Sequence, residues 1–363
     1  MAYTTINKST EHFNTKLYTG NGSTGHAITG VGFQPDWTWF KSRSGTNHHV
    51  LFDVVRGVTK GIYPNLGNAE DTLANSLSSF DSDGFTLGAD TGSGGAVNGN
   101  TNSMVSWNWK AGTTTGINNT GSTIQPATGG YSFNQTSGFS MVKYLGNLTS
   151  GAKVPHGLGV APKMVITKKI GSNSNWITYH AKVNEGTTPQ NYAMSLNYNY
   201  AKDGESYYWN NTAPDAVNFT LGNSNQVNDN SNYHIAYCFA EIPGYSKVGD
   251  FFGNGSASTG KFIYTGFKPK FIITKRDDST SGGSWLIYDT ARNTLNPADK
   301  VLSSSDNSNE SGWGYNFDID ILSNGFRMTS ATTYTNVTNA HYIYYAVAEA
   351  PLVGTNGVTA KAR

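Results

Sequence analysis

Two Asp-x-x-Arg pairs are the residues of this sequence whose spacing most invites a chemical interpretation. They are Asp53 with Arg56 and Asp289 with Arg292, and each pair closes an apolar run. A carboxylate in this position could act as a general acid. A carboxylate followed three residues later by arginine at a strand end more simply makes a local or inter-domain ion pair. The spacing therefore predicts structural ion pairs.

A catalytic interpretation would need a second carboxylate at a defined distance from the first. The residues considered differ along the chain. Asp81 and Asp83 follow the first pair, and Asp318 and Asp320 follow the second. In the stretch between them His180 holds the corresponding place, and the residue considered after it is Asp215. The residue types at these equivalent positions differ between the three stretches, which a shared catalytic site would not allow. A structural role explains them better. We expect no catalytic residue and no enzymatic activity.

An aromatic stretch at residues 197–212, NYNYAKDGESYYWNNT, is the most suggestive exposed chemistry. Flat aromatic faces can stack on sugar rings while asparagine and aspartate bond hydroxyl groups, so the stretch is a candidate for contact with a glycan or receptor. The alternative is a hairpin whose rings fold onto a sheet or into a subunit interface, where tyrosine and tryptophan are also enriched. The candidate contact residues are Tyr198, Tyr200, Tyr207, Tyr208 and Trp209.

No metal or cofactor site is expected. His48 and His49 are adjacent, with His26 nearby, but zinc sites use about three or four ligands at characteristic spacing, and neighbours on a strand point to opposite faces. We interpret these histidines as solvent-exposed loop residues. Calcium binding by the loops around residues 81–83 and 228–230 stays an alternative, although the twelve-residue EF-hand pattern is absent. The GSGG at 92–95 has no following lysine, and neither G-x-S-x-G nor a cysteine-nucleophile signature occurs.

Charge and composition exclude other classes of partner. The chain has 25 Lys and Arg against 24 Asp and Glu, so its net charge of +1 favours neither nucleic acid nor an acidic membrane. Only 13% of residues are charged, yet mean hydropathy is -0.44, because Ser, Thr, Asn and 42 glycines supply the polarity. Such a composition with 13% aromatics is typical of many short strands joined by turns.

The remaining features predict a chain that is made in a cytosol and stays soluble. The single cysteine, Cys238, lies in an apolar run and is expected to pack as a small buried hydrophobe. No signal-peptide pattern opens the sequence, and no stretch approaches the roughly 18 apolar residues of a membrane span.

A recurring hairpin is predicted to position these residues. Residues 32–57 read as a turn with Pro35, an apolar strand ending in Lys41 and Arg43, a polar loop and a second strand. The layout returns at residues 157–183 and 266–292. Further landmarks recur in the same order within each copy: Pro35, Pro162 and Pro269; Phe85, Phe219 and Phe326; Trp109, Phe239 and Val347. A period of roughly 110 residues indicates an array of domains rather than a solenoid.

The repeat predicts an all-β chain of three tandem antiparallel β-sandwich domains of jelly-roll type. At 104–112, Val105, Trp107 and Trp109 alternate onto one face of a closing strand. The expected boundaries are an N-terminal arm at 1–16, a first repeat at 17–112, a linker at 113–136, a second repeat at 137–244, a third at 245–351 and a C-terminal tail at 352–363.

The motifs also resemble a domain of structural proteins of tailed bacteriophages, especially marine ones, often labelled tail fibre or virion structural protein without an assigned biochemical activity. The resemblance rests on YTGNGST (18–24), ITGVGFQPD (28–36), KSR (41–43), LFDVVRG (51–57), SFDSDGFTLG (79–88) and SWNWKAG (106–112). The third repeat keeps YTGFKPK, YDTAR and SNGFRM in looser form, and the second is more divergent. The resemblance implies a virion location and transfers no catalytic residue.

Together these patterns predict a non-enzymatic virion structural protein on the particle surface, synthesised in the host cytoplasm. A tail fibre or spike that contributes to host attachment is the leading hypothesis, since weak sites repeated within a chain and an oligomer gain avidity. Capsid decoration and a carbohydrate-binding adhesin are the alternatives. The expected partners are other virion proteins, further copies of the chain in a trimer by analogy, and a host surface glycan.

Overall fold

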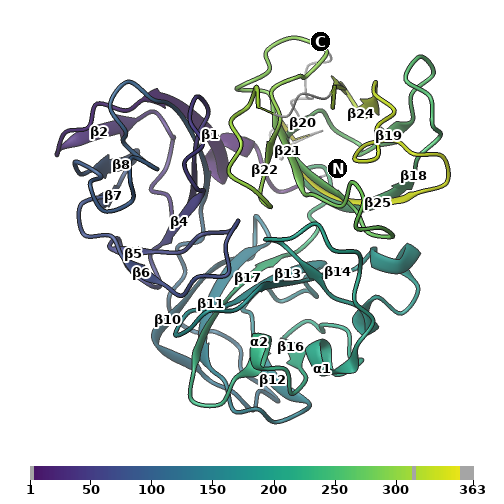
Figure 1. The fold of residues 1–363 in the computed structure, drawn as a ribbon. Helices are drawn as coiled ribbons and strands as arrows, with labels where there is room; N and C mark the ends of the chain where they lie inside the picture. The colour runs from purple at the N-terminus through teal and green to yellow at the C-terminus, as the bar shows by residue number, and fades with distance from the viewer. Residues whose placement is uncertain (1–3, 313–315, 352–363) are drawn as a thin grey trace.

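The computed structural model describes residues 4–312 and 316–351, and the chain is all-β with a few short helical turns. Figure 1 shows three lobes around a common centre, in the order of the chain. We call residues 4–112, 113–244 and 245–351 segments 1, 2 and 3. The expected C-terminal tail at 352–363 lies outside the described residues.

Segment 1 contains two antiparallel sheets and a two-stranded ribbon, preceded by the short helix η1 (Ser9–Glu11). The larger sheet has the order β1-β9-β3-β4 and the smaller one β2-β8-β7, while β5 pairs with β6. The strands are β1 (Phe13–Thr19), β2 (His26–Thr29), β3 (Trp37–Ser42), β4 (Val50–Asp53), β5 (Lys60–Gly61), β6 (Asp71–Thr72), β7 (Leu77–Asp81), β8 (Gly84–Leu87) and β9 (Ser103–Trp109).

Segment 2 has a larger sheet of order β10-β11-β17-β13-β14-β15 and a smaller pair, β12-β16. Its strands are β10 (Pro126–Asn134), β11 (Phe139–Leu145), β12 (Ala152–Pro155), β13 (Met164–Lys169), β14 (Trp176–His180), β15 (Met194–Ser195), β16 (Asn218–Leu221) and β17 (Tyr233–Phe239). Its short helices are η2 (Val183–Gly186), η3 (Pro189–Asn191), α1 (Ser206–Trp209) and α2 (Asn225–Asn228).

Segment 3 repeats the arrangement with sheets of order β18-β25-β20-β21-β22 and β19-β24-β23. Its strands are β18 (Ser246–Phe252), β19 (Phe262–Tyr264), β20 (Pro269–Arg276), β21 (Leu286–Asp289), β22 (Leu302–Ser303), β23 (Ile319–Leu322), β24 (Gly325–Met328) and β25 (His341–Ala348).

Strand register makes the three larger sheets equivalent. In each sheet, one residue of the central strand pairs with a landmark of the closing strand on one side and with the last residue of the following strand on the other. These sets are Trp37 with Trp109 and Asp53, Met164 with Phe239 and His180, and Phe271 with Val347 and Asp289. The landmarks chosen from the sequence therefore occupy equivalent positions, and Asp53, His180 and Asp289 end the same strand in the three segments.

One face of every larger sheet packs into a single central core shared by all three segments. Val105, Trp107 and Trp109 lie on this face, as their alternation predicted. Trp37 of segment 1 stacks on Tyr237 of segment 2, with 4.7 Å between ring centroids. The opposite face of each larger sheet contributes to an outer core with the smaller sheet of its own segment.

The shared core is tightly filled. The void at its centre measures about 10 Å³ and is lined by apolar side chains, including Trp39, Ile166 and Ile273. A void of this size holds roughly one water molecule, and apolar walls would offer it no hydrogen bonds. The centre of the molecule is therefore a close-packed core and not a ligand cavity.

Two predicted boundaries are wrong. Ile6 and Phe13, from the expected arm, are buried in the central core, and β1 pairs with β9 from Phe13 onward. In the expected linker, β10 pairs with β11, and Thr113 bridges to Phe133. The linker was misjudged because β10 changes register between Pro126 and Tyr131, which interrupts the alternation by which strands are recognised.

Candidate functional site

The first Asp-x-x-Arg pair is a buried hydrogen-bonded junction. Asp53 ends β4, and its Oδ2 lies 2.6 Å from Nε of Arg56, with both side chains fully buried. The Arg56 guanidinium also donates to the backbone oxygens of Lys60 and Leu51 and reaches Glu70 at 3.1 Å. The expected ion pair is present, and it fixes the turn that follows β4.

The same carboxylate joins segment 1 to segment 2. The hydroxyl group of Tyr237, on β17, donates to Oδ2 of Asp53 at 2.7 Å. Tyr237 is fully buried, and burial raises its pKa far above the ordinary value, so the phenol stays a donor. A carboxylate that accepts from an arginine and a phenol has few remaining lone pairs for other chemistry.

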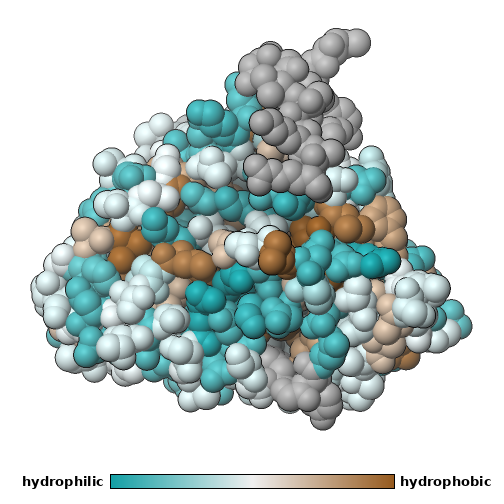
Figure 2. Space-filling view, turned by 90° about the horizontal axis from the view of Figure 1, so that it is seen from above, coloured by the Kyte–Doolittle hydropathy of each residue, from teal (hydrophilic) through white to brown (hydrophobic). Residues whose placement is uncertain are grey.

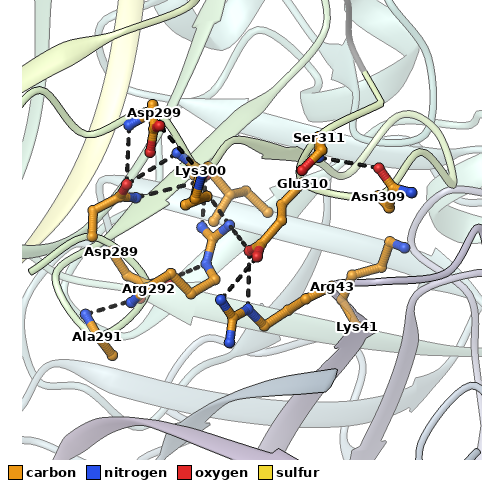
Figure 3. Close-up of polar contacts among 12 residues, drawn as sticks. Lys41, Arg43, Asp289, Ala291, Arg292, Asp299, Lys300, Asn309, Glu310 and Ser311 are labelled. Carbon is orange, nitrogen blue, oxygen red and sulfur yellow. Dashed lines mark hydrogen bonds and ion pairs between the residues drawn. The ribbon is translucent and has the colours of Figure 1, made fainter. Parts of the chain in front are cut away.

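The second pair forms the equivalent junction between segments 3 and 1. Oδ2 of Asp289 accepts from Nε of Arg292 at 2.6 Å and from the indole Nε1 of Trp107 at 3.0 Å. Glu310 extends the network, because it lies 3.8 Å from Arg292 and accepts two hydrogen bonds, at 2.8 and 2.9 Å, from Arg43 of segment 1 (Figure 3).

His180 holds the equivalent place in segment 2 and contacts segment 3. Its Nε2 lies 3.1 Å from the backbone oxygen of Tyr344, and burial lowers its pKa to about 4. A neutral imidazole thus replaces the ion pair at this junction. Each of the three equivalent strand ends contacts the next segment in a closed cycle, so the three residues are structural.

Three buried lysines were not recognised from the sequence. Lys41, Lys168 and Lys275 hold equivalent positions on the central strands, and burial lowers their pKa values to about 8, 7 and 7. Lys41 donates to the carbonyl oxygen of Asn307 and Lys168 to that of Gly67, each in a neighbouring segment. The available signal is the recurrence of a cation where each apolar strand ends, which by itself indicates only a strand terminus.

The histidines are incorporated into the fold. His49 is fully buried and accepts a hydrogen bond from Nε1 of Trp39 at 2.8 Å, so its predicted exposure is wrong. His48 is exposed and bonds Asn65, and His26 is half-buried against Asn98. Across residues 4–312 and 316–351, no group of three or more His, Cys, Asp or Glu residues is placed to hold a metal ion. Cys238 is buried as expected, and burial raises its pKa to about 12.

The aromatic stretch divides into a buried and an exposed part. Tyr208 and Trp209, on α1, are 5% and 2% exposed and belong to the outer core of segment 2, so their assignment as surface contacts is corrected. Tyr207 packs against that core from a half-buried position. Their apolar rings fill the space between α1 and the smaller sheet, which was the alternative weighed for this stretch.

Tyr198 and Tyr200 remain exposed, at 39% and 52%, and their rings stack in parallel at 4.9 Å. The loop that carries them also touches segment 3, because the Lys202 amide donates to the backbone oxygen of Asp277. Tyr198 borders an open groove of about 570 Å³ whose walls include Asn68, Asn173 and Lys169. Figure 2 shows that apolar side chains on the viewed face form separate patches within a largely hydrophilic surface.

A partly buried charge cluster, with His341 and Asp277 at its buried end, joins segments 2 and 3. His341 lies between two carboxylates, with Nδ1 2.9 Å from Asp277 and Nε2 3.3 Å from Asp250. Burial opposes its charge, but the hydrogen bonds to both carboxylates prevail and raise the pKa of His341 to about 9. Lys182 and Lys202 of segment 2 approach the same two carboxylates at 3.4 and 3.9 Å.

The raised pKa of His341 predicts a loss of stability in alkaline solution. Since the folded-state value of about 9 exceeds the unfolded value, the contribution is complete below about pH 6.5 and declines as the pH rises through 9. We expect His341→Gln to remove about 2–3 kcal/mol of unfolding free energy at pH 6 and almost none at pH 10. Urea unfolding of the original protein and of His341→Gln between pH 6 and pH 10 measures the difference in unfolding free energy. The contributions of the buried lysines cancel in this difference, because both proteins contain them. A difference that does not vary with pH would contradict the assignment.

The fold and its junctions define a class: an all-β protein whose three related segments enclose one core and whose buried ionisable groups hold the segments together. The chain belongs to the family described as "Domain of unknown function (DUF7483)", whose profile matches residues 8–351. One family profile thus spans all three segments. Searches of curated proteins and of solved structures found no match. Within the described residues, no helix has the length and apolar character needed to cross a membrane.

Proposed function

We propose that this chain is a non-enzymatic structural protein of a bacteriophage virion, exposed on the particle surface as a tail-fibre or tail-spike component that contributes to host attachment. The proposal takes the virion location from the sequence resemblance at residues 18–112. Its partners would be other virion proteins, further copies of the chain in a homo-oligomer and a host surface glycan.

The observation that carries a structural role is the cycle of buried contacts between segments. Asp53, His180 and Asp289 each hold the neighbouring segment, and the central aromatic core packs against all three. Side chains that often perform chemistry are here committed to packing and hydrogen bonds. We propose that each segment is a β-sandwich repeat and that the three together form one rigid unit.

The experiment that tests the proposal is a measurement of copy number and position in purified particles, by quantitative mass spectrometry and imaging of labelled virions. We expect a few to some tens of copies, located at the tail. Hundreds of copies spread over the head would favour capsid decoration instead. Absence of the chain from purified particles would contradict a virion role of either kind.

Carbohydrate binding by an adhesin is a second candidate, favoured by the stacked Tyr198 and Tyr200 pair beside an open groove. Exposed parallel tyrosine rings can stack on a sugar, and the asparagine side chains of the groove can bond its hydroxyl groups. Unlike Tyr208 and Trp209, these two residues can be replaced without removing core packing.

A further inference from the structure

The edge of segment 3 carries an open groove that differs from the corresponding edge of segment 2. β18 is the edge strand of the larger sheet, and β19 is the edge strand of the smaller one. In segment 2 the equivalent strand, β11, is covered by β10. In the described part of segment 3 no strand covers β18, and a groove of about 570 Å³ lies along β18 and β19.

Exposed aromatic rings line this groove. Phe252 on β18 is 41% exposed, and Phe262 and Tyr264 on β19 are 42% and 59% exposed. Phe262 and Tyr264 flank the buried Ile263, so strand alternation turns both rings away from the core. Rings presented in a groove provide apolar faces for a ligand that has both CH and hydroxyl groups.

Tyr344 lines the floor of the groove and is 1% exposed. It lies beside Gly249, where even a methyl group would overlap the tyrosine oxygen. A ligand hydroxyl group that reaches this floor would have the Tyr344 hydroxyl as a hydrogen-bond partner, since a phenol both donates and accepts.

This Tyr344–Gly249 pair is specific to segment 3. The residues equivalent to Tyr344 are the small Ser106 and Ala236, while those equivalent to Gly249 are Lys16 and Val142. A large ring thus replaces a small side chain on β25, and glycine replaces a large one on β18. The exchange keeps the Tyr344 hydroxyl open to the groove.

The charges around the groove favour an anion. Three lysines, Lys182, Lys247 and Lys261, line the groove against two carboxylates, Glu241 and Asp250. Asp250 is already paired with Lys182 and His341. The other two lysines line the groove without a carboxylate partner in the described part of the chain. The ammonium group of Lys247 lies 5.7 Å from the centre of the Tyr264 ring.

We propose that this groove binds an acidic saccharide. Tyr264 and Phe262 would stack on the sugar, Lys247 and Lys261 would bind uronate carboxylates, and Tyr344 would bond a hydroxyl group. The inference goes beyond the proposed function, because it assigns a ligand class and a site that do not depend on a virion location.

The test is isothermal titration of the full chain with a hexamer of galacturonic acid. We expect saturable binding that weakens with added salt, since two lysine contacts are screened. Tyr264→Ala and Lys261→Glu should each weaken binding about tenfold, and Tyr344→Phe about threefold. Thermal unfolding verifies that each variant remains folded.

Segment 2 offers a matched control, because Lys143 lies over the exposed Tyr233 ring at 4.9 Å and neither residue lines either of the two grooves described above. Lys143→Glu and Tyr233→Ala should retain the original affinity. No saturable binding, equal binding of a neutral glucose hexamer, or a loss caused by the control variants would overturn the proposal.

Two other outcomes would also overturn it. Loss of binding in Tyr198→Ala and Tyr200→Ala, with the segment 3 variants unaffected, would move the site to the tyrosine pair. Dimerisation that depends on Phe262 and excludes the saccharide would make the groove an interface between copies. Absence of the chain from virions would contradict the proposed function and leave a positive binding result intact.

Discussion

Replacing Asp289 with alanine should lower the free energy of unfolding by about 3–5 kcal/mol, because the change removes the nearest counter-ion of a buried guanidinium and leaves only Glu310, 3.8 Å away. Arg292 and Asp289 are both fully buried, and the indole of Trp107 loses its acceptor at the same time. The loss therefore weakens both the turn after β21 and the contact between segments 3 and 1. Equilibrium unfolding in urea at neutral pH measures it.

Asp320→Ala provides the matched control, since Asp320 pairs with Arg327 in the same segment but the arginine side chain is 43% exposed. Water can solvate that arginine after the change, so the expected cost is below about 1 kcal/mol. The double variant Asp289→Leu with Arg292→Met should recover part of the lost stability, because neither charge then remains buried. Equal effects of Asp289→Ala and Asp320→Ala would contradict the structural role of the buried pair.

Replacing Trp37 with alanine should also cost about 3–5 kcal/mol, and the whole chain should still unfold in one transition at a lower temperature. The Trp37 ring belongs to segment 1, but it packs against Phe139 and Tyr237 of segment 2, at 5.5 and 4.7 Å between ring centroids. Its removal leaves a cavity in the core shared by all segments. Differential scanning calorimetry measures both the shift and the number of transitions.

The exposed Tyr200→Ala variant is the control for Trp37→Ala and should change stability by less than about 0.5 kcal/mol. Agreement between calorimetric and van't Hoff enthalpies would indicate that the segments unfold together. Separate transitions, of which only one shifts in Trp37→Ala, would mean that each segment unfolds by itself and would contradict the importance of the shared core.

Local features were predicted well where a short stretch contains its own geometric signal. The alternation of Val105, Trp107 and Trp109 correctly placed the three side chains on one face of β9, which packs into the central core, while the opposite face is buried as well. The Asp83-Gly84 dipeptide is a further local turn signal, and Asp81 pairs with Gly84 across the β7–β8 turn. The first signal is the two-residue alternation of a strand, and the second is a glycine that can adopt turn conformations. Each is contained within a few adjacent residues.

Burial of individual side chains was predicted less well. His49 and Trp209 stand in polar stretches that read as loops, yet both are buried, because residues distant in sequence close over them. Polar residues likewise surround β10, so its stretch was predicted to be a linker. The N-terminal residues show no apolar period, so the burial of Ile6 and Phe13 was not predicted. Hydrophobic pattern alone does not distinguish an exposed aromatic side chain from one that is covered by another part of the chain.

The all-β class, the threefold recurrence of a hairpin and the Asp-x-x-Arg pairs can be read from the sequence, since they depend on residues that are neighbours along the chain. The enclosure of one core by three segments, the contact of Asp53 with Tyr237 and that of Asp289 with Trp107 are visible only in the folded chain. Partners separated by more than 180 positions leave no local pattern. Their contact arises when burial of the shared aromatic faces brings the segments together.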